Sequence, residues 1–327
     1  MKDWRFGVAI VTLALLSPGT ASASSGERVS LQGRPKGEHR SAQHEGAPVT
    51  FASPASGPAT GESATIGALL FRPADMAPGE RRPAIVALHG CGGMYSAVKA
   101  RREALSVRHQ TMADLLTAEG YVVLFPDSFR SRGVEEICTT KARERTVTAV
   151  HRQQDARAAL AWLQRRDDVL ADRVAVLGWS NGGSTVLGAL DARQGEVASW
   201  LDADPGKPYF RAGVAFYPGC SAFLRGARSY TLATTLALYI GDADDWTPPA
   251  PCVDLAARLA AVREPVAITV YPGAYHGFDG PSTAKRVRMD VPGGVNPGKG
   301  VTVATDPAAR DDAYAKMKAF LRERLAP

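Results

Sequence analysis

Short apolar runs rich in β-branched residues recur along the chain, and segments with helical periodicity lie between them. Several runs are apolar at nearly every position, which is typical of strands buried on both faces of a sheet. The runs expected to form strands are Ile66–Phe71, Ala84–Leu88, Val122–Phe125, Val174–Leu177, Gly213–Phe216, Thr235–Ile240 and Ala267–Tyr271. The expected helices are Val107–Glu119, Arg143–Arg165, Gly182–Leu190, Ala250–Val262 and Ala308–Leu325. This alternation predicts one α/β domain over residues 63–327, with a mostly parallel sheet flanked by helices.

The residues before this pattern differ in composition. Two basic residues precede a short apolar run, Val8–Leu16, and Ala21-Ser22-Ala23 supplies a small-residue cleavage pattern. We therefore expect residues 1–23 to be a secretory signal peptide, which makes the mature protein periplasmic or secreted without a membrane anchor. Residues 24–62 are rich in Gly, Ser, Pro and Ala, which predicts a flexible leader. Residues 281–306, rich in Gly and Pro, are expected to form a long loop.

Composition and charge exclude several classes of protein. With 45% hydrophobic and 22% charged residues among 327, the chain is an ordinary globular protein with a large core. The net charge is +6, but the basic residues are scattered rather than gathered in a stripe with aromatic residues. We therefore expect no nucleic-acid partner.

Four cysteines, an even number in a chain expected to be exported, favour disulfide bonds. Their spacing does not resemble that of a zinc site, so we expect no metal. Sequence alone allows three pairings, and the alternative is four buried free thiols. The expected order of strands favours Cys91–Cys138 and Cys220–Cys252.

The most informative stretch surrounds Ser180. The run Val174–Leu177 leads into Gly178-Trp179-Ser180-Asn181-Gly182, and a helix made of small residues is expected to follow. This G-x-S-x-G pattern between a strand and a helix is typical of a nucleophile elbow, in which the serine hydroxyl stands above the sheet edge. The backbone N–H of Asn181 would then help to bind an oxyanion. A tight turn without chemistry and a degenerate dinucleotide loop are the alternatives, and Ser180 would crowd a pyrophosphate.

A serine nucleophile needs a general base, which elimination among six histidines identifies as His276. His39 and His44 fall in the expected leader, and His109 and His151 fall on expected helices. His276 follows the last expected strand, at the sheet edge where the sites of α/β proteins are built.

The base in turn needs an orienting carboxylate. Asp242, Asp244 and Asp245 all follow the strand Thr235–Ile240, and the chain order Ser…Asp…His is that of α/β-hydrolases. The Gly-rich turn His89-Gly90-Cys91-Gly92-Gly93 follows an earlier strand and resembles an HGGG-type motif. We expect the N–H of Cys91, rather than its thiol, to face the oxyanion; the alternative is a plain Gly-rich loop.

Taken together, these residues resemble the dienelactone hydrolase family of α/β-hydrolases over roughly residues 63–325. The resemblance is carried by Leu88–Gly93, Pro126–Phe129, Gly178–Gly183, Phe216–Cys220, Asp244–Pro248 and Ala274–Phe278. It implies that the acid lies a few residues before a proline, which selects Asp244, with Asp245 as the alternative. One departure is that dienelactone hydrolases proper use a cysteine nucleophile where this chain has Ser180.

The resemblance and the motifs together imply a serine hydrolase of carboxylic esters or lactones, which forms an acyl-enzyme and requires no cofactor. A peptidase or a polyester hydrolase with the same triad is the alternative within enzymes. A catalytically silent binding protein of the envelope is the alternative outside them. Few residues separate Gly219 from Thr234, so we expect no large lid domain and a small-molecule substrate.

Overall fold

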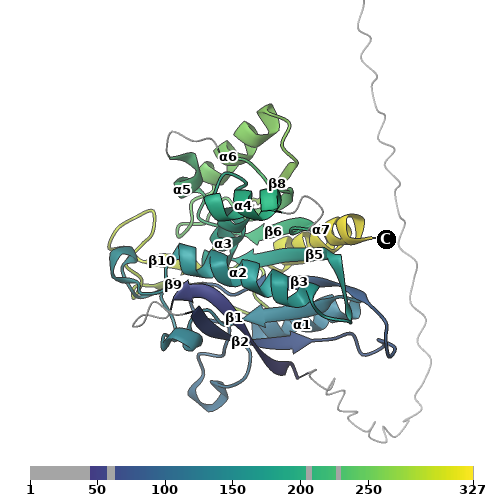
Figure 1. The fold of residues 1–327 in the computed structure, drawn as a ribbon. Coiled ribbons are helices and arrows are strands. Elements are labelled where there is room, and N and C mark those ends of the chain that lie inside the picture. The colour runs from purple at the N-terminus through teal and green to yellow at the C-terminus, as the bar shows by residue number, and fades with distance from the viewer. Residues whose placement is uncertain (1–44, 57–62, 204–207, 226–229, 327) are drawn as a thin grey trace, which may run out of the picture. The chain divides into compact units, whose positions relative to one another are not determined.

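A single mixed sheet forms the centre of the protein, with the order β1-β2-β4-β3-β5-β6-β7-β8 (Figure 1). The computed structural model describes residues 45–56, 63–203, 208–225 and 230–326. Within them the strands of the sheet are β1 Ala47–Ser56, β2 Ser63–Phe71, β3 Arg82–Leu88, β4 Val122–Pro126, β5 Val169–Trp179, β6 Ala212–Phe216, β7 Thr235–Gly241 and β8 Val266–Tyr271. From β4 to β8 neighbouring strands run parallel, whereas β2 is antiparallel to both β1 and β4. The seven strands expected from the sequence are present, and the mostly parallel α/β-hydrolase sheet is confirmed.

Helices cover both faces of this sheet. They are α1 Val107–Ala118, α2 Ala149–Gln164, α3 Asn181–Ala189, α4 Gly195–Ala203, the single turn α5 Ser221–Leu224, α6 Ala250–Ala261 and α7 Pro307–Leu325. Helices α2 and α3 pack together on one face, while α1 and α7 lie on the other (Figure 1). Glu119, just after α1, pairs with Lys318 and Arg322 of α7 at 3.3 and 3.8 Å. Between β6 and β7 the described chain holds only α5, so no large lid is inserted there.

Burial on both faces explains why the central strands are continuous apolar runs. Every residue of β4 and β6 is buried, as are the last five residues of β3. Strand β8 lies at the edge of the sheet, and within it only Tyr271 is buried. The core therefore follows the middle of the sheet, and the strand ends that emerge from it are rigidly placed.

The expected flexible leader over residues 24–62 is wrong for the part that the structure describes. Ala47–Ser56 is strand β1, which pairs with β2 from Ala47 opposite Leu70 to Ser56 opposite Ser63. Phe51 is 5% exposed and its ring lies 6.2 Å from that of Trp162 on α2. Burial of an apolar side chain against α2 therefore orders this strand despite the Gly- and Ser-rich composition around it. The signal-peptide prediction, His39 and His44 lie outside the described residues.

The helix expected to begin at Arg143 begins instead at Ala149. Thr148 is its N-cap and accepts a hydrogen bond from the backbone N–H of His151, whose ring nitrogen accepts one from the N–H of Thr148. This reciprocal cap stops the helix from extending further toward the N-terminus. Helix α4 was not expected from the sequence.

The segment 281–306, expected to be a long loop, contains two short paired strands, β9 Arg286–Arg288 and β10 Val301–Val303. Asp245 holds this hairpin, because its carboxylate accepts hydrogen bonds from Thr302 N–H at 2.7 Å and Thr302 Oγ1 at 2.8 Å. Val301 and Val291 pack in a small apolar cluster with the Cys91–Cys138 pair. These contacts supply the ordering that composition alone did not predict.

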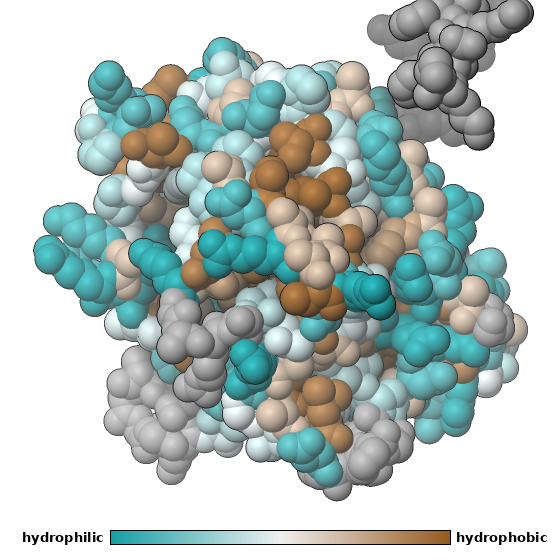
Figure 2. Space-filling view, turned by 90° about the horizontal axis from the view of Figure 1, so that it is seen from above, coloured by the Kyte–Doolittle hydropathy of each residue, from teal (hydrophilic) through white to brown (hydrophobic). Residues whose placement is uncertain are grey.

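The surface carries small apolar patches. Figure 2 shows several along the middle of the face seen from above, bordered by hydrophilic side chains. Among the large apolar side chains of the described residues, Val262 and Met289 are strongly exposed, at 70% and 64%. No helix in the described part of the chain is both long and apolar enough to cross a membrane.

Candidate active site

Ser180 occupies a sharp turn between β5 and α3. Its backbone has φ 53° and ψ −116°, outside the regions that L residues ordinarily adopt. The Ser180 N–H donates to the Phe216 carbonyl of the neighbouring strand at 2.9 Å, which fixes this conformation. Strand and helix therefore present the hydroxyl at the carboxyl edge of the sheet, in the geometry of a nucleophile elbow.

Two glycines allow the strand and the helix to approach so closely. A Cβ on Gly178 would collide with the backbone of Gly182, and one on Gly182 would collide with the carbonyls of Leu88 and His89. Because backbone atoms cannot move aside, neither position accepts a side chain. The G-x-S-x-G spacing is thus required by the packing of three backbone segments around Ser180.

His276 and Asp244 continue from Ser180 in a line of hydrogen bonds. His276 Nε2 lies 3.0 Å from Ser180 Oγ, and His276 Nδ1 lies 2.8 Å from Asp244 Oδ2. His276 is 4% exposed and Asp244 3% exposed. The topology explains the meeting, because the loops that follow β5, β7 and β8 all leave the same edge of the sheet.

The three aspartates that follow β7 have different surroundings. Asp244 Oδ1 accepts the backbone N–H groups of Trp246 and Thr247 at 2.9 and 2.8 Å, so its carboxylate is fixed and stabilised beside the imidazole. Asp245 binds the β9–β10 hairpin, and Asp242 accepts the Gly273 N–H at 2.6 Å. Of the three, only Asp244 contacts His276.

Aromatic rings enclose the His276 imidazole. The ring of Tyr217 lies 4.6 Å from it and that of Trp246 lies 4.8 Å from it, centre to centre. Thr247 Oγ1 lies 3.0 Å from both Asp244 Oδ2 and the Tyr217 carbonyl. These contacts limit rotation of the imidazole and exclude water from its faces.

Sequence reasoning missed a buried carboxylate behind the site, that of Asp279. It accepts the indole N–H of Trp179 at 2.7 Å and the hydroxyl of Tyr217 at 2.6 Å, and Arg108 lies 3.3 Å from it. Burial raises the pKa of Tyr217 well above its ordinary value, so the phenol stays a donor. Asp279 thereby connects the elbow, the Tyr217 turn and the loop of His276. Its position three residues after His276 was the signal available in the sequence.

The expected oxyanion donors, the N–H groups of Cys91 and Asn181, lie on the two segments that pack beside Ser180. Within the described part of the chain, neither N–H donates a hydrogen bond to another atom. The Cys91 segment is close to the serine, because a Cβ on Gly90 would lie 3.7 Å from Ser180 Cβ. Asn181 is the first residue of α3, where N–H groups are left without helical partners.

His89 fixes the peptide that carries the Cys91 N–H. Its Nδ1 lies 2.8 Å from the Gly90 carbonyl, and because a carbonyl only accepts, this nitrogen carries the hydrogen. Burial, with the nearby Arg152 charge, holds the pKa of His89 well below its ordinary value, so the ring is neutral. In a trans peptide the carbonyl and the N–H point in opposite directions, so this bond turns the Cys91 N–H away from the His89 ring.

Both expected disulfides are present. Cys91–Cys138 joins the turn after β3 to the segment before α2, and Cys220–Cys252 joins the turn after β6 to the start of α6. Each bond therefore braces a loop at the edge of the sheet where Ser180, Asp244 and His276 meet.

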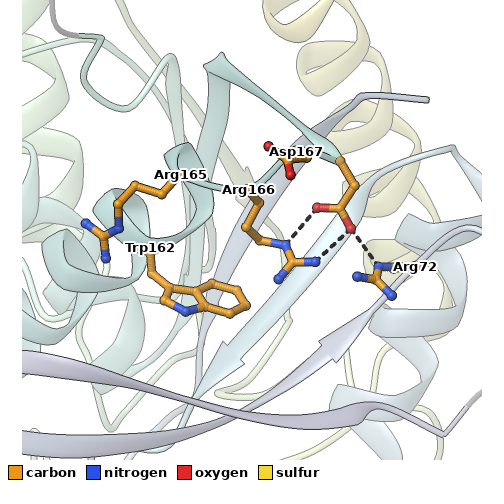
Figure 3. Close-up of a pocket in the computed structure, with 6 residues that line it drawn as sticks. Arg72, Trp162, Arg165, Arg166 and Asp167 are labelled. Carbon is orange, nitrogen blue, oxygen red and sulfur yellow. Dashed lines mark hydrogen bonds and ion pairs between the residues drawn. The ribbon is translucent and has the colours of Figure 1, made fainter. Parts of the chain in front are cut away.

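A pocket of about 520 Å³ lies away from these residues (Figure 3). Its lining includes Arg166 and Arg72, which both bind the carboxylate of Asp168, the residue just before β5. Ser180 follows the other end of β5, so the whole strand separates the pocket from the candidate site. Among the described residues, no group of three or more His, Cys, Asp or Glu side chains could hold a metal ion.

Solved structures share this fold at low sequence identity. A dienelactone hydrolase-like promiscuous phosphotriesterase, P91, from metagenomic libraries is 15% identical with a TM-score of 0.58, over 86% of this chain and 99% of that one. Propionate-bound esterase 2 of Thermogutta terrifontis is 18% identical with a TM-score of 0.54, over 85% and 96%. Dipeptidyl peptidase 4 of Porphyromonas gingivalis is 18% identical with a TM-score of 0.55, over 86% of this chain but 36% of that one.

No curated protein matches the chain in sequence. The family model of the dienelactone hydrolase family matches residues 66–325, which is most of the chain and includes every residue of the candidate site. On this match, the protein belongs to the dienelactone hydrolase family, whose members are hydrolases that act on ester bonds.

Proposed function

We propose that the protein is a serine carboxylester hydrolase in which Ser180 is the nucleophile, His276 the general base and Asp244 the orienting acid. The observation that carries this proposal is the line of contacts from Ser180 Oγ to His276 Nε2 at 3.0 Å and from Nδ1 to Asp244 Oδ2 at 2.8 Å. The strained backbone of Ser180, at φ 53°, supports the same assignment. A catalytically silent binding protein would not need this arrangement.

Acylation begins when His276 Nε2 takes the hydroxyl proton of Ser180 as Oγ bonds to the ester carbonyl carbon. The carbonyl oxygen becomes an oxyanion, which the N–H groups of Cys91 and Asn181 bind. His276 then gives its proton to the departing alkoxide, the carbon–oxygen bond of the ester breaks, and an acyl-Ser180 remains. Asp244 stabilises the imidazolium throughout and holds its Nδ1–H.

Deacylation repeats these steps with water. His276 takes a proton from water as the hydroxide oxygen bonds to the acyl carbon, and the oxyanion forms again in the same place. The bond to Ser180 Oγ breaks, and His276 returns the proton to that oxygen. The products are a carboxylic acid and an alcohol, and a lactone yields both groups in one molecule.

Two features support small soluble esters as substrates and export as the setting. The described chain places no lid between β6 and β7, which favours open access for small esters and lactones. Two disulfides favour an oxidising compartment, in agreement with the secretory signal expected over residues 1–23. We infer a periplasmic or secreted enzyme.

The test is labelling of the mature protein by a fluorophosphonate, with the adduct located by peptide mass spectrometry. We expect one adduct, on Ser180, together with hydrolysis of p-nitrophenyl acetate. Both should be lost in Ser180→Ala and in His276→Ala. Ser184→Ala is the matched control, because Ser184 lies one turn further along α3 and its hydroxyl bonds the Gly219 N–H at 2.8 Å. The paraoxon-phosphorylated structure of Thermogutta esterase 2 supports the choice of an organophosphorus probe.

Absence of an adduct on folded protein would overturn the triad mechanism and favour the binding-protein alternative. Labelling of Ser180 without hydrolysis of any ester in a panel of acyl and alcohol sizes would instead refute the ester substrate. Peptide and polyester substrates in the same panel test the two alternatives within enzymes, a peptidase and a polyester hydrolase with the same triad.

A further inference from the structure

Arg152 is a buried cation on the side of the candidate site that lies behind the oxyanion donors. It sits on α2 and is 1% exposed. Among the described residues, no carboxylate lies within ion-pairing distance of its guanidinium, and its Nε has no hydrogen-bond partner. Removing an arginine from water without a paired charge costs free energy, so some interaction must account for this residue.

The guanidinium bridges the two segments that carry the oxyanion donors. Its Nη2 donates to the backbone carbonyl of His89 at 2.6 Å, and its Nη1 donates to the side-chain Oδ1 of Asn181. The ring of Phe129 lies 5.0 Å beneath its central carbon and supports its plane. One side chain thereby fixes the turn after β3 to the first residue of α3.

Because peptide groups are planar, these hydrogen bonds fix the directions of two backbone N–H groups in the turn after β3. Arg152 holds the His89 carbonyl, and the His89 ring in turn holds the Gly90 carbonyl at 2.8 Å. In a trans peptide the N–H points away from the carbonyl. The Gly90 N–H therefore faces away from Arg152, which holds the His89 carbonyl. The Cys91 N–H likewise faces away from the His89 ring, which holds the Gly90 carbonyl. The same guanidinium, through the Asn181 side chain, limits movement of the residue that supplies the second N–H.

The acid on the helix of Arg152 does not pair with its charge. Asp155, the nearest acid on its helix, is bound through both oxygens by Arg132 at 2.8 Å. Burial lowers the pKa of Arg152 to about 10, and Asp155 and Asp127 oppose that shift. The guanidinium remains charged at neutral pH, so its field acts on negative charge that forms near Asn181 and Cys91.

We propose that Arg152 is a positioning residue of the oxyanion hole, which holds the Cys91 and Asn181 segments in register and favours the oxyanion by its charge. This inference rests on the proposed serine-esterase function. It predicts an effect on the transition state rather than on binding of the ester, because the bridged groups face charge that exists only after Ser180 attacks.

The test compares Arg152→Met and Arg152→Lys with the parent chain, using p-nitrophenyl acetate and the reversible inhibitor phenyl trifluoromethyl ketone. For Arg152→Met we expect kcat to fall about 100-fold, as when one oxyanion donor is lost. KM should stay unchanged, and the inhibitor, which forms an oxyanion on Ser180, should weaken in parallel with kcat. Arg152→Lys should recover part of both losses, since its ammonium can still reach the His89 carbonyl.

Arg157→Met is the matched control for loss of a buried arginine from α2. Arg157 is 6% exposed and pairs with Glu196, away from the His89 turn. It should lower the melting temperature without changing kcat or inhibitor affinity. If Arg152→Met folds and its kcat stays within about threefold of the parent, the inference is wrong.

If Arg152→Met does not fold, Asn181→Ala tests the same bridge from its other end. This variant removes the acceptor Oδ1 but keeps the backbone N–H, so kcat and inhibitor affinity should again fall together at constant KM. An unchanged kcat would overturn the inference. Fluorophosphonate labelling of Ser180 in the parent chain separates this outcome from failure of the proposed function, which would abolish labelling.

Discussion

Neighbouring residues of the same type have different roles in this protein, and the contacts of each decide its role. Asp244 and Asp245 are adjacent, yet one carboxylate faces His276 and the other binds Thr302 of the hairpin. The sequence could restrict the acid to three aspartates after β7, and the family resemblance favoured Asp244. It could not separate the two neighbours by spacing, because the choice depends on which way a turn directs each side chain. No sequence motif marks Asp279, because its partners, Trp179 and Tyr217, are distant from it in sequence.

Buried histidines make stability depend on pH. Burial lowers the pKa of His109 from 6.5 to about 4, although its ring hydrogen-bonds the Met94 carbonyl. Between these two pKa values the unfolded chain binds more protons than the folded one. The contribution of His109 to the free energy of unfolding is therefore fully present above pH 6.5 and is lost as the pH drops toward 4. His109 alone contributes about 3 kcal/mol to this loss.

His109→Phe should therefore flatten the acid limb of the stability curve. Phenylalanine keeps the contacts with the rings of Trp179 and Phe125 but cannot titrate. The measurement is urea unfolding of both chains between pH 4 and pH 7. His89, whose pKa is lowered in the same direction, should leave a residual slope. Equal slopes in the variant and the parent would show that His109 does not titrate as its burial implies.

At the scale of elements, the pattern of apolar residues predicts a helix or strand wherever its own sequence supplies the apolar side chains that are buried. Strands β3, β4 and β6 were foreseen because they are apolar at nearly every position. Strand β1 was not, because Phe51 is a lone large residue in a Ser- and Pro-rich stretch and is buried by α2. The β9–β10 hairpin is fixed by Asp245, a contact that local composition does not encode.

The two disulfides brace elements with different consequences for activity. They close loops with sequence separations of 47 and 32 residues, and each should contribute about 4 kcal/mol to stability in the chain-entropy estimate. Cys91→Ala/Cys138→Ala removes the brace from the turn that supplies the Cys91 N–H, so kcat should fall along with stability. Cys220→Ala/Cys252→Ala should lower stability by a similar amount and change kcat less.

Urea unfolding and kcat for p-nitrophenyl acetate, measured for both double variants at a temperature where each is folded, test this difference. Equal losses of kcat in the two would contradict a special role for the Cys91 turn. Loss of stability without any loss of kcat in Cys91→Ala/Cys138→Ala would show that the His89 and Arg152 contacts alone hold that turn.

For the whole molecule, β1 is an outer strand of the main sheet and covers the edge of β2. A chain that starts at Glu45 keeps β1, whereas one that starts at Gly57 exposes the edge of β2 and the surface that Phe51 covers. The shorter chain should lose at least about 2 kcal/mol of stability from Phe51 alone. Urea unfolding of the two chains measures this difference, with Phe51→Ala in the longer chain as the matched control. Equal unfolding midpoints would place the start of the domain at β2, as composition indicated.

The order of strands also has a kinetic meaning. In the sheet, β3 lies between β4 and β5. Along the chain, β4 and α2 come between β3 and β5, so β5 pairs with β3 only across this intervening segment. His89 and Ser180, at the ends of β3 and β5, meet only across that pairing, which closes a loop of about ninety residues, as between Leu88 and Gly178. Such long closures are slow compared with helix formation. During refolding, recovery of ester hydrolysis should therefore trail the return of helical signal, and the appearance of activity marks the moment at which the two halves of the sheet join.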